Sequence, residues 1–243
     1  IALYRGVPGE PTTGPVATVE GCVIGCDPPC GTGGRGAGIG VTWNAKLVAI
    51  GNVIHHYWKG IGTFGDSEAE LYNNVVRDQL GWGVIASGNS QMVAMNNLIA
   101  RNGTTGLSAW NPGVSGMFIN NILWKNGTSI DEWVGIKTGI WFNVSPTTFP
   151  LSNNLSWGND NFDACTGGMP NESPCTPLAF DGVDGNLVLD PLLADPASND
   201  WHLLPGSPAI DAGPDWIDDQ DLSRSDIGVY GGPYAPALID GLP

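Results

Sequence analysis

A fixed spacing of Asn and Gly residues constrains this chain more than any other feature. Five segments share one template: a β-branched or apolar residue, an Asn, two more apolar residues and then a Gly-apolar pair. The Asn residues, at spacings of 22, 23, 24 and 33, are Asn52, Asn74, Asn97, Asn121 and Asn154. A repeat of this length indicates a solenoid, in which each repeat stacks on its neighbours. We therefore expect functional side chains in columns along the stack rather than in one central pocket.

Each repeat is predicted to consist of three short strands separated by tight turns. In the clearest copy, apolar residues 92–95 and 98–99 flank an Asn pair, and a turn at 101–105 leads into a third strand at 106–110. Asn suits the bend because it tolerates the left-handed backbone conformation. Three strands in 22 to 24 residues is the size of one coil of a parallel β-helix.

Stacked coils place equivalent residues in columns about 4.8 Å apart. The sequence predicts three apolar columns, which are Val53, Val75, Leu98, Ile122 and Leu155, then Ile54, Val76, Ile99 and Leu123 ending in Ser156, and finally Ile39, Ile61, Val84, Leu107 and Ile140. The first two are adjacent in sequence, so the periodicity does not decide which of them faces inward. The Asn residues are predicted to form a ladder of side-chain amides with a structural role.

Two stretches depart from the regular period. Residues 16–45 are interpreted as a first, irregular coil whose turn is enlarged by a segment with three cysteines. The 33-residue step between Asn121 and Asn154 holds an insertion at about residues 128–137. Insertions in a solenoid fall on one face and often form its binding surface.

Composition narrows the choice of partner and compartment. The 243 residues carry a formal net charge of −15, which argues against nucleic acid and anionic membranes as partners because both bind clustered Lys and Arg. No run of 18 apolar residues exists, so no membrane span is predicted. The chain starts at Ile1 without an initiator Met or a signal peptide, which we interpret as a mature product or a fragment of a longer chain.

The cysteines favour an oxidising compartment. Cys165 and Cys175 bracket a loop rich in Gly, Pro and Asn, and a disulfide is predicted between them. Cys22, Cys26 and Cys30 are four residues apart, but a Pro-Pro pair excludes the helix that would align them. Their spacing also lacks the Cys-x-x-Cys pairs of zinc sites. One disulfide plus one unpaired thiol is favoured over a metal cluster, and the pairing stays open.

The repeats resemble those of the right-handed parallel β-helix proteins, the pectate-lyase-like superfamily. Four C-terminal stretches are also similar, in order, to the segment that ends many secreted bacterial members. They are DPLLADP at 190–196, DWHL at 200–203, PGSPAIDAG at 205–213 and DIGVY at 226–230. The resemblance implies a right-handed coil and a secreted protein. It implies function only loosely, because such relatives include lyases, hydrolases, epimerases, adhesins and phage spikes.

One turn column offers charged side chains on successive coils. Four positions after the ladder Asn come His56, Asp78, Arg101 and Lys125. Polyuronate lyases need a base that takes the α-proton and a cation that neutralises the carboxylate. Arg101 and Lys125 are candidates for these roles, with His56 as an alternative base. The favoured alternative is an exposed turn column whose unlike charges lie side by side for stability.

Ten Trp residues are many for a chain of this length. Trp124 and Trp157 occupy equivalent positions on successive coils, and Trp110 lies late in a third strand. Flat exposed rings bind sugars through their faces, but Trp also fills solenoid cores. Trp110, Trp124 and Trp157 are therefore candidates for a carbohydrate platform, and core packing is the equal alternative.

A run of carboxylates near the C-terminus is a candidate calcium site, since calcium takes six to eight oxygen ligands. The residues are Asp215, Asp218, Asp219, Asp221 and Asp226. Their spacing lacks the Gly and terminal Glu of an EF-hand loop. An acidic surface loop without metal is the alternative interpretation.

Together these patterns predict an all-β protein with a single domain, 1–243. A right-handed parallel β-helix over 16–165 is followed by a loop-rich cap over 166–243 that covers the last coil, because an open coil exposes unpaired strand edges. The first functional hypothesis is a secreted or cell-surface (extracellular or periplasmic) protein that binds or acts on a polysaccharide, as a lyase or hydrolase if enzymatic. The second is a non-catalytic structural protein that self-associates end to end or carries further coils upstream.

Overall fold

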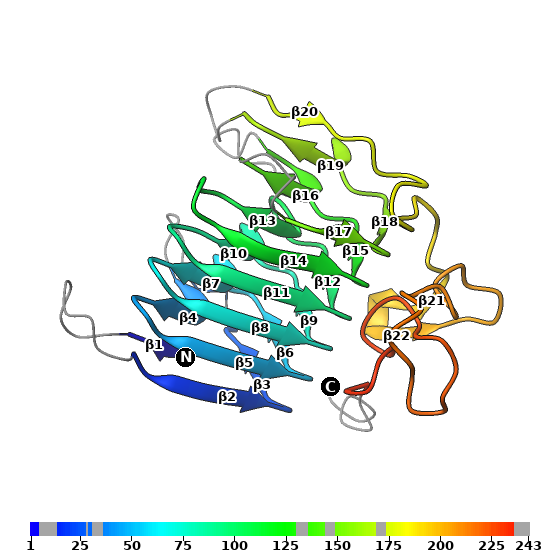
Figure 1. The fold of residues 1–243 in the computed structure, drawn as a ribbon, viewed down its shortest axis with the longest axis horizontal. Coiled ribbons are helices and arrows are strands. Elements are labelled where there is room, and N and C mark those ends of the chain that lie inside the picture. Colours follow the sequence, from blue (N-terminus) through cyan, green and yellow to red (C-terminus); the bar gives the residue numbers. More distant parts are fainter. Residues whose placement is uncertain are drawn as a thin grey trace.

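The computed structural model describes residues 1–4, 14–27, 29–30, 36–129, 136–143, 149–168 and 174–235. Over these residues the chain coils through three β-sheets, and each regular coil adds one strand to every sheet (Figure 1). Strands of successive coils pair in parallel within these sheets. The architecture is the parallel β-helix that the repeat predicts, and the described residues contain no α-helix.

The sheets are named A, B and C in the order in which a coil enters them. Sheet A contains β1 (Ala2–Leu3), β4 (Ala37–Thr42), β7 (Lys59–Phe64), β10 (Trp82–Ala86), β13 (Leu107–Ala109), β16 (Thr138–Phe142), β19 (Phe162–Thr166) and β20 (Thr176–Pro177). Sheet B contains β2 (Val16–Glu20), β5 (Lys46–Ile50), β8 (Glu68–Tyr72), β11 (Gln91–Met95), β14 (Ser115–Ile119) and β17 (Leu151–Ser152). Sheet C contains β3 (Val23–Gly25), β6 (Val53–His55), β9 (Val75–Arg77), β12 (Leu98–Ala100), β15 (Ile122–Trp124) and β18 (Leu155–Trp157).

The predicted columns are in register, and burial shows which of them faces inward. In sheet C, Val75 lies between Val53 and Leu98 on neighbouring strands, as predicted. The column of Ile54 and Val76 belongs to the central core between the three sheets. The column of Val53, Val75 and Leu98 points the other way and packs in a second apolar cluster with residues of the C-terminal segment. Both columns are buried because both faces of sheet C are covered.

The Asn column forms the predicted ladder. Asn74 is representative: its Oδ1 accepts hydrogen bonds from N and Nδ2 of Asn52 at 3.1 and 2.9 Å, and its Nδ2 donates to Oδ1 of Asn97 at 3.0 Å and to two main-chain carbonyls. The ladder continues beyond the fifth predicted Asn to Asn186 in the C-terminal segment. A second ladder, which the repeat analysis missed, runs through Gln79, Asn102, Asn126 and Asn159. Buried amides that are fully bonded along the axis hold the coils in register.

Close packing between coils explains the repeated glycines of sheet A. A Cβ on Gly83 would lie 2.6 Å from the carbonyl oxygen of Gly106 on the next coil, and a Cβ on Gly106 would lie 2.7 Å from that of Gly139. No side chain fits at such distances. The equivalent residue on the last coil is Asp163, whose carbonyl oxygen meets Gly139 in the same way.

The C-terminal segment covers two different surfaces. β20 pairs antiparallel with β19, and Leu187 bridges to Leu155, so residues 176–187 lie against the last coil. The remainder, with the hairpin of β21 (Leu193–Asp195) and β22 (Asp200–Leu203), runs back along the side of the solenoid beside sheet C (Figure 1). This lateral course was not anticipated, because the cap was expected over the last coil. The domain boundary at residue 165 stays a prediction.

The structure contains the predicted disulfide and resolves the open pairing of the other three cysteines. Cys165 is bonded to Cys175, which ties β19 to the segment that enters β20. Cys26 is bonded to Cys30, and Cys22 is an exposed free thiol. Within the described residues, no helix is long and apolar enough to cross a membrane.

Candidate functional site

The turn column after sheet C stacks as predicted. His56, Asp78, Arg101 and Lys125 have left-handed φ angles of 64°, 54°, 54° and 49°. Such angles are uncommon outside Gly and Asn and mark a tight turn. The shared conformation places these side chains on successive coils, but they do not converge on one point.

Asp78 lies between two arginines. It accepts hydrogen bonds from Nε and Nη2 of Arg101 at 2.7 and 2.8 Å, and from Nη1 of Arg77 at 2.7 Å. Burial alone would raise the pKa of the Asp78 carboxyl, but the bonds from Arg101 and then Arg77 outweigh burial and hold the pKa below its ordinary value. Asp78 is therefore an ionised partner of the arginines and is poorly suited as a proton acceptor.

Arg101 anchors the C-terminal segment. Its Nη1 donates to the carbonyl oxygen of Pro196, and its Nη2 donates to Oδ1 of Asn199 at 2.8 Å. The guanidinium carbon also lies 4.7 Å from the ring centroid of Trp201. These contacts use the planar fork of the guanidinium in several directions at once. The pairing of Arg101 with Asp78 agrees with the predicted neighbouring unlike charges, but the Arg101 side chain is only 22% exposed, because the C-terminal segment lies against it. The lyase role stays a prediction.

The other members of the column have local partners. Lys125 Nζ lies 4.4 Å from the ring centroid of Trp124, a cation–π contact. His56 Nδ1 lies 3.2 Å from Nδ1 of His55 and 3.8 Å from Asp27. Burial, followed by the charges of Arg77 and His56, lowers the pKa of His55. Within the column, Asp78 and Arg101 are paired directly, whereas Lys125 and His56 contact residues outside it; a catalytic role for these residues stays a prediction.

The three predicted tryptophans belong to two surfaces. Trp110 packs against Trp141 on the outside of sheet A, with ring centroids 5.2 Å apart. Trp124 is 9% exposed and lies edge-on to Trp201 of the C-terminal segment. Trp157 is adjacent to Trp124 in register and is 36% exposed. The three rings therefore do not form a single platform, and a binding role for Trp157 stays a prediction.

The acidic run near the C-terminus makes local bonds. Asp219 accepts hydrogen bonds from the main-chain nitrogens of Asp226 and Gly232, and Asp221 accepts from Ser223. Within the residues that the structure describes, no group of three His, Cys, Asp or Glu side chains is arranged to hold a metal ion. Calcium binding stays a prediction.

The outward residue of each Asn pair attaches the C-terminal segment to the solenoid. Asn73 Nδ2 donates to the carbonyl oxygens of Val229 and Gly231 at 2.8 and 2.7 Å. Equivalent bonds run from Asn96 and Asn120 to the carbonyl oxygen of Asp226 and from Asn153 to that of Ala212. The left-handed residues of the four pairs thus form an outer column whose amides bond to the C-terminal segment, beside the inner ladder.

A groove opens where this segment meets the edge of sheet B. It has a volume of about 320 Å³, and its lining is mostly apolar. Its walls are Tyr72, Asn73, Met95 and Asn96 on the solenoid and Trp216, Ile217, Asp218, Pro233 and Tyr234 on the segment. Neither Tyr72 nor the two aromatic residues of the segment were predicted as site residues.

Three aromatic side chains surround the groove. Tyr72 and Tyr234 have ring centroids 5.3 Å apart with planes inclined by 40°. Trp216 is 66% exposed and Tyr234 is 52% exposed. Rings of this kind are costly to leave in water unless they meet a ligand, so contiguous exposed aromatic residues mark binding surfaces.

Carboxylates lie beside these rings. The hydroxyl of Tyr72 donates to Oε2 of Glu70 at 2.9 Å. Burial, followed by this hydrogen bond, raises the pKa of Tyr72 to about 12, so the hydroxyl stays protonated. On the opposite wall stands the exposed Asp218. The groove thus combines flat apolar faces with nearby hydrogen-bond acceptors.

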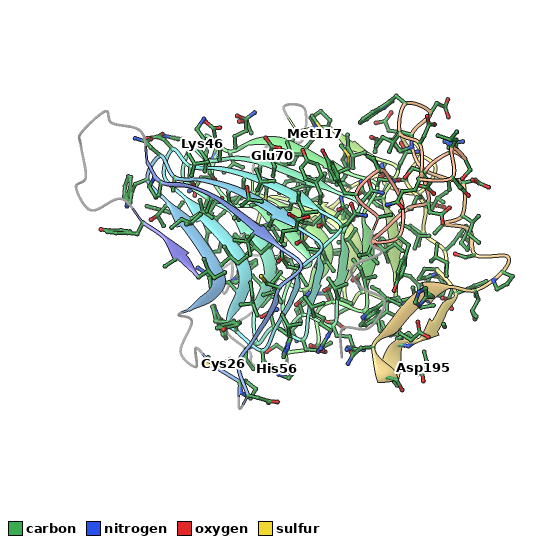
Figure 2. All side chains as sticks on the ribbon, turned by 90° about the horizontal axis from the view of Figure 1, so that it is seen from below. Cys26, Lys46, His56, Glu70, Met117 and Asp195 are labelled. Atoms are coloured by element: carbon green, nitrogen blue, oxygen red, sulfur yellow. A yellow bond between two sulfur atoms is a disulfide. The ribbon has the colours of Figure 1, made fainter. Side chains whose placement is uncertain are left out.

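The groove continues onto the outer face of sheet B. Glu70 and Met117 lie on this face with Lys46, whereas Cys26, His56 and Asp195 lie on the opposite side (Figure 2). The strands of sheet B alternate buried and exposed residues, as in Glu68, Ala69, Glu70, Leu71 and Tyr72 of β8. That alternation was the available sequence signal for Tyr72, whereas no periodic signal precedes Trp216.

A second hollow, of about 300 Å³, lies at the end of the last coil. Asp163 and Asp181 both line it. The Asp163 carboxylate accepts a hydrogen bond from Ser156 at 2.8 Å. Burial raises the pKa of Asp163. The hydrogen bond from Ser156 lowers this pKa in part, whereas the charge of Asp181 raises it further. Asp163 occupies the position that is Gly60, Gly83, Gly106 and Gly139 on the preceding coils. We therefore interpret this hollow as part of the end of the solenoid, after which the described residues form no further coil.

Comparison with known proteins supports the architecture. Residues 13–161 match the family described as "Right handed beta helix region". No curated protein and no solved structure matches the chain.

Proposed function

Since the chain belongs to the right-handed β-helix family, we propose that it is an extracellular protein that binds a polysaccharide in the aromatic groove and across the outer face of sheet B. Family membership supports the fold and leaves the ligand open. The single observation that carries the proposal is the groove formed by Tyr72, Trp216 and Tyr234, with Glu70 beside it.

The location favours a long ligand. Equivalent residues on neighbouring strands of sheet B recur about every 4.8 Å along the solenoid axis. A polymer that lies along this axis contacts the same position of one coil after another. Stacking on the three rings then supplies apolar contact, while the carboxylates and amides accept or donate hydrogen bonds to hydroxyl groups.

Two further observations support the compartment and the choice of binding over cleavage. Two disulfides are compatible with secretion, because such bonds persist in oxidising environments. The cation proposed for lyase chemistry, Arg101, is engaged with Asp78 and with the C-terminal segment. The hypothesis of a purely structural protein stays a prediction.

The test is retardation of the protein in native gels that contain soluble polysaccharides. We expect at least one neutral or basic polysaccharide to retard the wild type, and we expect Trp216→Ala and Tyr234→Ala to reduce that retardation. Trp157→Ala is the matched control, because it removes another exposed Trp away from the groove. If no polysaccharide retards the protein, or if only the Trp157 variant loses retardation, the proposal is wrong.

A further inference from the structure

We propose that the groove selects a positively charged amino-polysaccharide, a polymer of glucosamine-type sugars with free amines, over neutral and anionic polymers. This inference rests on the proposed function and deepens it by naming the class of sugar. It is carried by the charges that surround the aromatic rings.

The outer face of sheet B carries more carboxylates than cations. Its three outward columns are Val16, Lys46, Glu68, Gln91 and Ser115, then Thr18, Val48, Glu70, Val93 and Met117, and finally Glu20, Ile50, Tyr72, Met95 and Ile119. The lysine among them is paired with Glu68, with Nζ 2.7 Å from the carboxylate. The face therefore presents a net negative field toward a ligand.

One carboxylate lines the groove and a second lies beside it. Asp218, on the C-terminal segment, is in the lining, and Glu70 on the solenoid is bonded to the hydroxyl of the lining residue Tyr72; both carboxylates are exposed. The Tyr72 hydroxyl orients one oxygen of Glu70, which leaves the other oxygen for a ligand. An amine that enters between the walls meets negative charge from two directions and lies close to aromatic faces.

Charge complementarity decides between the polymer classes. A polyuronate brings its own carboxylates against Glu70 and Asp218, and like charges repel. A neutral sugar covers these carboxylates without a compensating charge, which costs desolvation energy. A protonated amine forms charge-assisted hydrogen bonds with them and gains cation–π attraction from the rings. The amino-polysaccharide is therefore the class that satisfies both the rings and the acids.

The experiment compares three oligosaccharides of equal length by calorimetry. They are a fully deacetylated glucosamine oligomer, its N-acetylated counterpart and a neutral glucose oligomer. The measurement is made at about pH 5.5, above the ordinary Glu pKa of about 4.3, where the sugar amines are protonated. We expect the deacetylated oligomer to bind at least about tenfold more tightly than the other two, the effect of one strong charge pair.

Variants separate selectivity from stacking. The double variant Glu70→Gln, Asp218→Asn is expected to lose the preference for the deacetylated oligomer and keep its affinity for the neutral one. Trp216→Ala is expected to weaken binding of all three. Glu68→Gln is the matched control, since it removes an acid of the same strand that is already paired with Lys46, and it should retain the preference.

The outcomes distinguish this inference from the proposed function. If the wild type binds the three oligomers equally, or if the double variant keeps its preference, the inference is wrong and polysaccharide binding stands. If binding of the deacetylated oligomer survives both Trp216→Ala and the double variant, the acidic surface merely adsorbs a polycation and the inference is also wrong. If no oligomer binds, the inference and the proposed function both fail.

Discussion

Replacing Arg101 with Ala separates a structural role for this side chain from a catalytic one. The change removes two hydrogen bonds to Asp78, one to Pro196, one to Asn199 and the contact with Trp201. Asp78 keeps its bond to Arg77. The hairpin of β21 and β22 loses its attachment to the turn column.

The magnitude follows from the burial of the pair. The side chains of Arg101 and Asp78 are 22% and 24% exposed, so their ion pair is neither fully exposed nor fully buried. An ion pair at the surface contributes about 0–1 kcal/mol to stability. Removing one partner of a buried ion pair costs about 3–5 kcal/mol. The two bonds to the hairpin add less than a well-formed buried hydrogen bond to a charged group, which contributes about 1.5–3 kcal/mol, because the guanidinium is partly exposed and water replaces these bonds in the variant. We expect Arg101→Ala to lower the free energy of unfolding by about 2–4 kcal/mol.

The assay is urea denaturation followed by Trp fluorescence, with limited proteolysis of the C-terminal segment as a local readout. Lys125→Ala, on the next coil of the same column, is the control. Lys125 is exposed and its cation–π contact is worth about 0.5–1 kcal/mol. Because the folded-state pKa of Asp78 is depressed, its contribution is present above the ordinary carboxyl pKa and is lost as the pH falls through the folded value. The gap between wild type and variant should therefore narrow in acid. A wild-type midpoint for Arg101→Ala, with the segment still protected, would refute the anchoring role.

Two further predictions concern the coil itself. Gly83→Ala should lower the free energy of unfolding by about 1–3 kcal/mol, because the new Cβ would lie 2.6 Å from the Gly106 carbonyl oxygen. Gly62→Ala should be neutral in the same denaturation assay, because its new Cβ would lie 3.6 Å from the nearest atom, Cδ of Lys59, which is an ordinary contact distance. Equal losses in the two variants would contradict the packing argument. Asp163→Asn should melt at a higher temperature than wild type near neutral pH. Burial raises the folded-state pKa of Asp163, so ionisation of this carboxyl destabilises the fold as the pH rises above the ordinary Asp pKa of about 3.9 and through the folded value. Below the ordinary pKa the two proteins should melt at the same temperature. A thermal shift that does not change with pH would contradict this assignment.

The solenoid could be predicted because its determinants are local and recur. Five successive coils, from that of Asn52 to that of Asn154, place an Asn at the same bend, and Asn74 bonds within its own coil and to the coils before and after. The loop closed by Cys165 and Cys175 was also visible, since the two cysteines bracket it. The insertion predicted at about residues 128–137 interrupts the regular period, but residues 130–135 of it lie outside the part of the chain that the structure describes. Periodicity fails where contacts are distant in sequence and do not repeat.

The candidate groove depends on such distant contacts. Tyr72 meets Tyr234 at a separation of 162 residues, and Asn73 meets Gly231 at a separation of 158 residues. Nothing in the spacing of the repeats specifies where the C-terminal segment returns. The catalytic hypothesis for Arg101 had the same weakness, because the residues that bond to it lie 95 and 98 positions further along the chain.

One sequence feature did contain information about the return path. Sheet C has two adjacent apolar columns, and adjacent residues of a strand point to opposite faces. Ile54 and Val76 fill the core, so the column of Val53 and Val75 had to be covered from outside, because a contiguous apolar patch is rarely left in water. The C-terminal segment supplies this cover with residues such as Trp201.

The same reasoning identifies the face that stays open. The strands of sheet B alternate buried residues with more exposed ones, and the more exposed positions include Lys46, Glu68, Glu70 and Gln91 as well as apolar residues such as Val93. This is the pattern of a sheet with one solvated face. A segment that covers sheet C but stops at the border of sheet B leaves that solvated face accessible and adds Trp216 and Tyr234 along its edge. The position of the cover thus leaves the aromatic groove at the accessible surface, whereas Arg101 of the turn column lies against the C-terminal segment; the proposed long ligand would reach the solenoid at the groove.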